Sequence, residues 1–212
     1  MSDDLVWYAA YGSNIQEERF LCYIRGGRPN GRSSIYEGCR DKTLPVDDEE
    51  IYLKNLLYFA KRSKGWNHRG VAFISPEFDD SIITYGRIFL IKKSQFIDLF
   101  KQETNTRTDI DVDFECCIEH GNLIVKDSSW YGNVLHLGSK GDYPIFTITN
   151  KTYLSDELNA PDQAYLQTIA AGIAEVFNVN TNELIDYFIK SPGINRVLSS
   201  EQLVTYLNKL DV

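Results

Sequence analysis

The stretch Leu5-Val6-Trp7-Tyr8-Ala9-Ala10-Tyr11 runs directly into Gly12-Ser13-Asn14, and this junction decides how the fold is interpreted. A short run of bulky apolar residues predicts a buried strand, and the glycine predicts its end. Residues 15–24 then predict a helix, for which Asn14 and Glu17 have capping-box spacing. A strand that opens a helix through glycine leaves backbone N–H groups available to an anion. On these residues alone, a turn with a helix cap is the simpler interpretation and a binding loop is the alternative.

The chain beyond this junction is rich in short candidate strands. Ile110, Val112 and Phe114 alternate with acidic residues, which is the period-two pattern of a half-buried strand. Many short strands separated by turn residues are typical of a closed or nearly closed β-barrel. The strands are predicted at residues 56–61, 71–75, 82–91, 110–115, 123–125, 134–137 and 145–148.

Helices are predicted among the strands and at the end of the chain. Residues 93–102 carry Phe96, Leu99 and Phe100 on one side, which indicates an amphipathic helix. After Pro161-Asp162, apolar residues repeat at helical spacing, and Pro192-Gly193 separates two further helices whose starts have box-like spacing. The last fifty residues are therefore predicted to be helical.

These patterns predict the α+β class. The expected architecture is a small mixed or antiparallel β-barrel with flanking helices and a C-terminal helical layer. We expect a barrel domain at residues 1–160 and helices at residues 161–212 packed on or beside it, with one domain overall as the alternative. Residues 25–55 contain the run Asp47-Asp48-Glu49-Glu50, which predicts a solvated loop that is either functional or mobile.

Composition narrows the classes of function. The 212 residues include 22 Lys and Arg against 30 Asp and Glu, so the net charge is −8. This acidic balance argues against nucleic-acid binding, which needs a basic face. The chain lacks an apolar run of about 18 residues and its start, Met1-Ser2-Asp3-Asp4, lacks an apolar signal core. We expect a cytoplasmic protein whose partner is a small molecule, with no membrane contact; its oligomeric state stays open.

Metal, cofactor and covalent chemistry receive little support from the sequence. The four cysteines form no C-x-x-C pair, so neither a disulfide framework nor a metal site is expected. His68, His120 and His136 are far apart and match no ligand spacing. No G-x-S-x-G is present, and Ser13 has no partner nearby in sequence. We therefore expect no metal, no cofactor and no covalent intermediate.

Glu103 is the strongest candidate for acid/base chemistry. It lies seven residues after Phe96, nearly two helical turns, so its side chain falls on the apolar side of the predicted helix. Burial raises the pKa of a carboxyl group, and the negative pole of the helix end acts in the same direction. These conditions suit a general acid/base near neutral pH. The alternative is a glutamate beyond a frayed helix end that points into water.

Aromatic residues among glycines are candidates for a pocket lining. A pocket for a small ligand is one interpretation, and a plain barrel core is the commoner one. The residues concerned are Tyr8, Trp66, Trp130, Tyr131 and Tyr143.

Several phrases in a fixed order together resemble the γ-glutamylcyclotransferase-like superfamily. The first is Tyr11-Gly12-Ser13-Asn14-Ile15, and the last before the C-terminal helices is a strand and helix ending at Glu103. Between them, Trp66 and the strand from Gly70 are similar to the family's W-x-G-G-x-A-x-I phrase. The helix after Pro161, with Tyr165, Ile169 and Gly172, resembles P-S-x-x-Y-x-x-x-I-x-x-G. The likeness extends from about Leu5 to Phe177.

The resemblance implies a fold, a site and a reaction. It implies a mixed barrel with a pocket between the Y-G-S-N turn and the glutamate. It also implies cyclisation of a γ-glutamyl amino acid or amine to 5-oxoproline, with release of the amine. Glu103 would be the general acid/base, and Tyr11, Gly12, Ser13, Asn14 and Ile15 would bind the substrate through the turn. No cofactor or metal is implied.

The chain departs from the family at two places. The usual second glycine before the strand at Val71 is Arg69, and Thr104-Asn105-Thr106-Arg107 follows Glu103 where the family often has glycine and an aromatic residue. Two alternatives to a cyclising transferase or lyase therefore stay open. One is a non-catalytic small-ligand-binding or regulatory module on the same fold. The other is a hydrolase in which Glu103 activates water.

Overall fold

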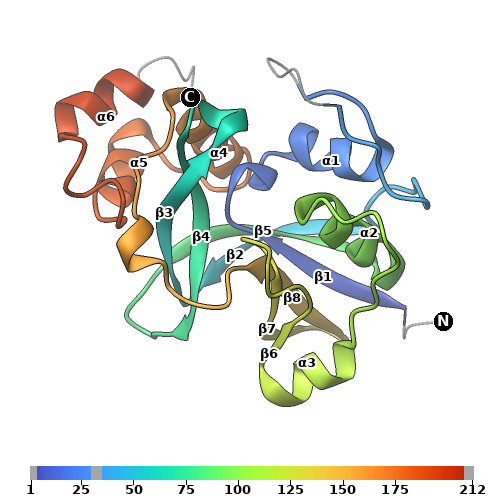
Figure 1. Ribbon diagram of the computed structural model, residues 1–212. Coiled ribbons are helices and arrows are strands. Elements are labelled where there is room, and N and C mark those ends of the chain that lie inside the picture. Colours follow the sequence, from blue (N-terminus) through green and yellow to red (C-terminus); the bar gives the residue numbers. More distant parts are fainter. Residues whose placement is uncertain (1–3, 30–34, 208–212) are drawn as a thin grey trace. The chain divides into compact units, whose positions relative to one another are not determined.

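The computed structural model describes residues 4–29 and 35–207, which form two compact units (Figure 1). The first unit comprises Met1–Ala10, Glu18–Ile51 and Arg87–Lys151. The second comprises Tyr11–Glu17, Tyr52–Gly86 and Thr152–Val212. Each unit is thus assembled from three separate stretches of sequence. The first residues of the predicted acidic start, Met1 to Asp3, lie outside the described residues.

A six-stranded mixed sheet, carried mainly by the first unit, has the order β2-β5-β1-β8-β7-β6. Strand β1 pairs antiparallel with β5 and parallel with β8, as Tyr8 shows by facing Phe89 and Phe146. All but the first residue of β1 are buried, as expected for an apolar run in the middle of a sheet. The strands are β1 (Leu5–Ala10), β2 (Asp47–Leu53), β5 (Thr84–Lys92), β6 (Asn122–Ile124), β7 (Asn133–Lys140) and β8 (Tyr143–Thr149).

Helices α1 (Glu17–Arg25), α2 (Lys93–Glu103) and α3 (Phe114–His120) complete the first unit. Helix α2 packs against β1 through its apolar side, and Phe96, Leu99 and Phe100 are fully buried. Aromatic rings from helices and strands meet in this core, where the ring of Phe20 stacks on that of Phe89 with 3.9 Å between centroids. The predicted amphipathic helix at residues 93–102 is confirmed.

The second unit combines a two-stranded hairpin with helices. Strands β3 (Asn55–Ser63) and β4 (Arg69–Phe78) form the hairpin, and α4 (Gln163–Val176), α5 (Thr181–Phe188) and α6 (Ser200–Leu207) are the helices. Three single-turn 3-10 helices also occur, at Ser13–Ile15, Lys64–Trp66 and Ser155–Glu157.

The predicted helix starts in the second unit are confirmed by their caps. The side chain of Asp162 accepts a hydrogen bond from the Ala164 N–H group, which caps α4. Asn180 and Glu183 form the predicted capping box of α5. Ser199 and Gln202 exchange the same pair of backbone and side-chain bonds before α6. The C-terminal helical layer therefore follows directly from these short sequence signals.

The α+β class, the mixed sheet and the flanking helices are confirmed, and the predicted strands other than 110–115 are present. Closure into a barrel is not among the pairings of the described residues: the six strands form a linear order from β2 to β6, and β3 and β4 pair separately. Register shifts between Ala60 and Ser63 and between His136 and Ser139 mark irregular points in β3 and β7.

The prediction of a strand at residues 110–115 is wrong, because Asp113 starts a helix there. Its side chain accepts a hydrogen bond of 2.9 Å from the Cys116 N–H group and caps α3. Val112, just before the helix, and Phe114, its first residue, are buried as the alternation suggests. Cys116 and Cys117 are consequently helical residues, of which Cys117 is buried and Cys116 half-buried.

Two further local predictions are wrong. The run Asp47-Asp48-Glu49-Glu50 begins strand β2, where the Asp48 carboxylate lies 2.6 Å from the Arg87 guanidinium and Glu49 pairs with Lys140. Cations from β5 and β7 thus compensate the acidic residues. Asn14 does not cap α1, because residues 13–15 form a separate 3-10 turn and the helix starts at Glu17.

All four cysteines are free thiols. Burial raises the pKa of Cys39 to about 12, and it does the same for Cys117.

Across residues 4–29 and 35–207, no helix combines the length and the apolar character needed to cross a membrane.

We predict an order of thiol labelling that follows burial. At pH 8, iodoacetamide should modify half-buried Cys22 and Cys116 well before buried Cys39 and Cys117, because only the thiolate reacts. Peptide mass spectrometry over time measures the order, and the unfolded protein, in which all four should react at similar rates, is the control. Labelling of Cys39 in the native protein as fast as Cys22 would contradict the described packing.

Candidate active site

Glu103 is the last residue of α2 and is half-buried. It lines a cavity of about 330 Å³ in the first unit, so the carboxyl group is neither in the core nor fully in water. The other lining residues come from the end of the helix and from a loop before β7: Thr104, Asn105, Lys126, Ser128, Ser129, Trp130 and Tyr131. The helix end therefore presents a carboxyl group to a cavity with hydroxyl, ammonium and aromatic neighbours.

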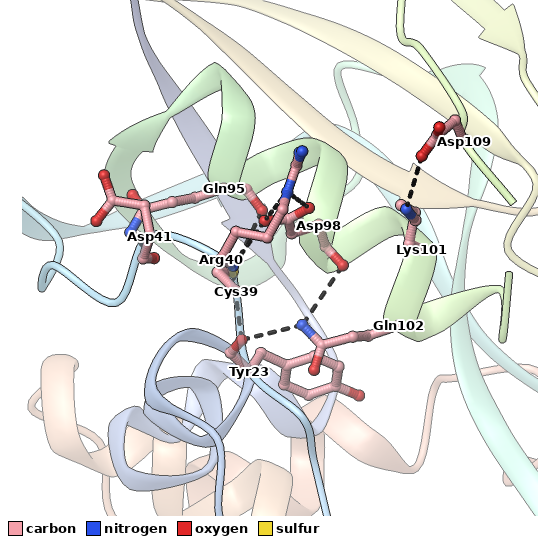
Figure 2. A network of polar contacts seen from close by, with 9 residues as sticks. All are labelled: Tyr23, Cys39, Arg40, Asp41, Gln95, Asp98, Lys101, Gln102 and Asp109. Atoms are coloured by element: carbon pink, nitrogen blue, oxygen red, sulfur yellow. Dashed lines mark hydrogen bonds and ion pairs between the residues drawn. The ribbon is translucent and has the colours of Figure 1, made fainter. Parts of the chain in front are cut away.

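The polar side of α2 is fixed by three buried or half-buried side chains (Figure 2). The Gln95 Nε2 group donates to the carbonyl oxygens of Asp41 and Thr43, at 3.0 and 2.7 Å. The Asp98 carboxylate accepts from the backbone N–H and the Nε of Arg40, both at 2.9 Å. These bonds attach residues 40–43, part of the predicted irregular segment, to the helix.

Gln102 extends this network to the residue before Glu103. Its Nε2 group donates to the Tyr23 carbonyl oxygen at 3.0 Å, and its Oε1 atom accepts from the Gly38 N–H group at 3.3 Å. Figure 2 shows Gln102 between α2 and Tyr23 of α1. The last turn of α2 is therefore held by long-range hydrogen bonds as well as by its apolar side.

Buried Tyr23 and Arg19 form a cluster with half-buried Tyr36, and the charge of Glu103 acts on this cluster. The Tyr23 hydroxyl donates to the Tyr36 hydroxyl at 3.4 Å, and the Arg19 guanidinium donates to the same oxygen at 3.0 Å. Burial raises the pKa of Tyr23 well above its usual value, and the negative charge of Glu103 raises it further. Tyr23 therefore stays a neutral hydroxyl group within the electrostatic range of Glu103.

The predicted binding turn, Tyr11 to Ile15, lies in the second unit. Ser13 and Asn14 are buried, and the Ile15 N–H group donates to the Gly12 carbonyl oxygen at 3.0 Å. A Cβ atom at Gly12 would lie 3.3 Å from the Tyr165 hydroxyl, so glycine allows a close approach there. That hydroxyl accepts a hydrogen bond of 3.1 Å from the Ala72 N–H group of β4.

Helix α4 supports the turn through a second glycine. A Cβ atom at Gly172 would lie 2.4 Å from the Gln16 backbone nitrogen and 2.6 Å from Ile15 Cγ2. Real Cβ atoms do not approach a backbone nitrogen so closely, so only glycine fits. Tyr165 and Gly172, two residues of the phrase after Pro161, thus have a physical role: both pack directly against the turn.

The structure groups the predicted site residues in two sets. The five turn residues, Tyr11 to Ile15, lie together in the second unit. Glu103 lies in the first unit. The role of each residue stays a prediction. Of the aromatic candidates, Trp130 and Tyr131 line the cavity beside Glu103, whereas Tyr8 and Trp66 are buried in the cores of their units.

Sequence reasoning missed Lys126, Tyr23, Tyr36 and Arg19. None of them belongs to a motif that we identified, and each reaches its partners over a long sequence separation or through a turn. Among the described residues, no group of three or more His, Cys, Asp or Glu side chains is arranged to hold a metal ion.

A second cavity, of about 460 Å³, lies in the second unit between β3, residues 81–85 and α5. Two of the polar side chains that line it already have partners in the chain. The Tyr187 hydroxyl accepts from the Tyr85 N–H group at 3.2 Å, and Glu183 accepts from the Asn180 N–H group at 2.8 Å. The cavity beside Glu103 contains the residue that the sequence predicts as the acid/base, and it is therefore the candidate for chemistry.

Comparison with known proteins gives one relative in sequence. The chain is 32% identical over 201 residues to histone deacetylase 5 of Arabidopsis thaliana. The match covers 88% of this chain but only 30% of the length of that protein. No family model matches the chain.

Three solved structures are similar at low identity. A γ-glutamyl cyclotransferase has a TM-score of 0.49 and 16% identity, with 97% of this chain and 99% of that chain covered. An uncharacterized human protein has a TM-score of 0.49 and 17% identity, with 82% and 80% covered. A yeast γ-glutamyl cyclotransferase specific to glutathione has a TM-score of 0.42 and 8% identity, with 99% and 100% covered. Two of the three thus bear the name of the family that the sequence phrases resemble, and none reaches a TM-score of 0.5.

We predict that Gly172→Ala destabilises the protein although alanine is the better helix former. Helix propensity alone would add about 1 kcal/mol of stability. Overpacking costs up to about 3 kcal/mol, and the 2.4 Å approach to a backbone nitrogen places Gly172 at that end, so a net loss of about 2 kcal/mol is expected. Urea unfolding measures the free energy of unfolding. Ala171→Gly, on the neighbouring position of α4, is the control and should cost about 1 kcal/mol. A stabilised Gly172→Ala protein would contradict the close seat of the turn.

Proposed function

We propose that the chain is a γ-glutamylcyclotransferase-like enzyme in which Glu103 is the general acid/base. The substrate is a γ-glutamyl amino acid or amine, and the products are 5-oxoproline and the released amine. The observation that carries this proposal is the position of Glu103, half-buried at the end of α2 and lining a cavity. The order of the sequence phrases from Tyr11 to Gly172 supports it independently.

The reaction needs one group that moves protons. The Glu103 carboxylate takes a proton from the substrate's α-ammonium group, and the freed amine attacks the γ-carbonyl carbon. The new C–N bond closes a five-membered ring, and the carbonyl electrons return as the bond to the leaving nitrogen breaks. Glu103 then gives its proton to that nitrogen, and the second proton of the new ring nitrogen follows through the same carboxylate, so the lactam is neutral and the amine leaves as an ammonium ion. Because the nucleophile belongs to the substrate, the protein contributes binding of the bent conformer and the proton transfer.

The roles proposed for the turn come from the resemblance. In this proposal the turn from Tyr11 to Ile15 binds the substrate's carboxylate or the developing oxyanion through backbone N–H groups other than that of Ile15, which donates to Gly12. The tight packing of Gly12 beside Tyr165 and of Ile15 beside Gly172 supports the proposal, because it fixes the backbone of the turn before a ligand binds. A turn whose backbone is already fixed loses less conformational entropy on binding a ligand than a flexible turn does.

A second candidate is a binding or regulatory module without turnover. The observation that favours it is the match to the Arabidopsis protein. The matched part makes up only 30% of the length of that protein. In that longer protein, the matched segment could serve as a module that binds a ligand, while other parts of the protein carry its named activity. The residues that depart from the family before Val71 and after Glu103 support the same alternative.

We predict that Glu103→Gln abolishes cyclisation, because glutamine keeps the size of the side chain but carries no exchangeable acid proton. The protein is incubated with a panel of γ-glutamyl dipeptides and γ-glutamylamines, and 5-oxoproline is measured by mass spectrometry. We expect a loss of about 10²–10⁴-fold in kcat, the usual contribution of a general acid/base. Glu119→Gln on α3, an exposed position, is the matched control and should retain full activity.

The outcomes separate the candidates. Full activity in Glu103→Gln would contradict the assigned mechanism. A γ-glutamyl ligand that raises the melting temperature of the native protein without any product would favour the binding module. Turnover of substrates that lack a free α-amino group would favour the hydrolase.

A further inference from the structure

The loop that follows Glu103 is a closed helix cap. Asn105 has a φ angle of +48°, and its N–H group donates to the Gln102 carbonyl oxygen at 3.2 Å. The Thr106 N–H group donates to the Lys101 carbonyl oxygen at 2.8 Å. This pair of bonds, with a left-handed residue between them, is the Schellman motif. The Thr104-Asn105-Thr106 sequence therefore ends α2 in one defined geometry directly after Glu103.

Lys126 completes this cap from outside the helix. Its ammonium group donates to the Thr104 carbonyl oxygen at 3.0 Å and to the Thr106 hydroxyl at 2.7 Å. The two threonine hydroxyls are 2.8 Å apart, and that of Thr104 donates to the Phe100 carbonyl oxygen. A lysine with three donors thus uses two of them on the segment that holds Glu103.

The position of Lys126 is fixed by its own backbone. Its N–H group and that of Val125 both donate to the Gly132 carbonyl oxygen, at 3.0 and 2.9 Å. A Cβ atom at Gly132 would lie 1.8 Å from the Lys126 carbonyl oxygen, so the turn closes only with glycine. The ammonium group is therefore a fixed charge at the C-terminal end of α2, where a cation is favoured.

We propose that Lys126 is a positioning residue for Glu103, which fixes the end of α2 and holds the Glu103 carboxyl group in its charged form. Lys126 and Glu103 line the same cavity. This inference rests on the proposed function for its catalytic meaning, but the contacts of Lys126 with the helix end are independent of that function.

Other groups in the first unit face Glu103 or its surroundings. Tyr23 of α1 is the titratable group that responds to the Glu103 charge, and Arg19 and Tyr36 lie beyond it. Tyr131 lines the same cavity. On α2 itself, the Lys101 ammonium is 3.7 Å from the Asp109 carboxylate and is thereby compensated. Lys126 is the cation that lines the cavity with Glu103, among the residues described there.

The sign of the effect follows from the charges. A cation near a carboxyl group favours the carboxylate and lowers its pKa, and the negative pole of the helix acts in the opposite direction. Removing Lys126 takes away the influence that favours the carboxylate, so the pKa of Glu103 is expected to rise. Because the carboxylate takes the first proton in the proposed reaction, the acidic limb of the pH profile of kcat/KM should move to higher pH.

The test compares Lys126→Met with Lys126→Arg. The titration of Glu103 is followed by NMR of ¹³C-labelled glutamate side chains, with Glu103→Gln used to assign the signal. We expect Lys126→Met to raise the pKa of Glu103 by about 0.5–1 and Lys126→Arg to restore it. Lys151→Met is the matched control, because Lys151 pairs with Asp127 rather than with the end of α2, and it should leave the titration unchanged.

The outcomes are distinct from those of the activity assay. An unchanged Glu103 titration in a folded Lys126→Met protein overturns the inference, whether or not 5-oxoproline is formed. An absence of cyclisation in the native protein, together with the expected shift in titration, removes the proposed function and leaves the charge coupling intact. Should Lys126→Met not fold, Thr106→Val removes one acceptor of the ammonium group, and a smaller rise in the pKa of Glu103 is then expected, with no change overturning the inference.

Discussion

The position of Glu103 depends on how α2 is held on two sides at once. Phe96, Leu99 and Phe100 bury its apolar side against the sheet, and the polar side is bonded to residues 38–43 through Gln95, Asp98 and Gln102. An amphipathic helix with only its apolar side fixed retains some freedom to rotate. Here the polar bonds remove that freedom, so a carboxyl group at the last helical position has a defined direction.

The charge of the helix end is the second constraint. The sequence alone predicts that burial and the helix dipole both favour the neutral carboxyl group. The structure adds Lys126, whose ammonium group binds the same helix end and favours the carboxylate. A general acid/base must exchange its proton in both directions, so opposing influences of this kind are more useful to it than a strong bias toward either form.

Local signals were sufficient for much of the fold. The strand at residues 5–11, the helix with Phe96 and the helix starts at Asp162, Asn180 and Ser199 each depend on a few neighbouring residues, and the structure has them all. The strand predicted at residues 110–115 is wrong because an alternating pattern of buried residues does not require a strand. Here Asp113 caps a helix that begins at Phe114. The acidic run failed as a loop because its compensating partners, Arg87 and Lys140, are distant in sequence. For the same reason the cluster of Arg19, Tyr23 and Tyr36 was not predicted.

The departures from the family phrases acquire a physical meaning in the structure. Asn67 and His68, which precede Arg69, have φ angles of +51° and +58°, and Asn105 after Glu103 has +48°. Glycine is the usual residue in this left-handed region, and asparagine is among the few others that tolerate it. The chain therefore makes both bends without glycine and places side chains there instead. Asn67 uses its amide to bind the Asp162 carboxylate at 2.9 Å. The chain therefore departs from the family phrases at these bends by side chains that can bind neighbouring groups, as Asn67 does.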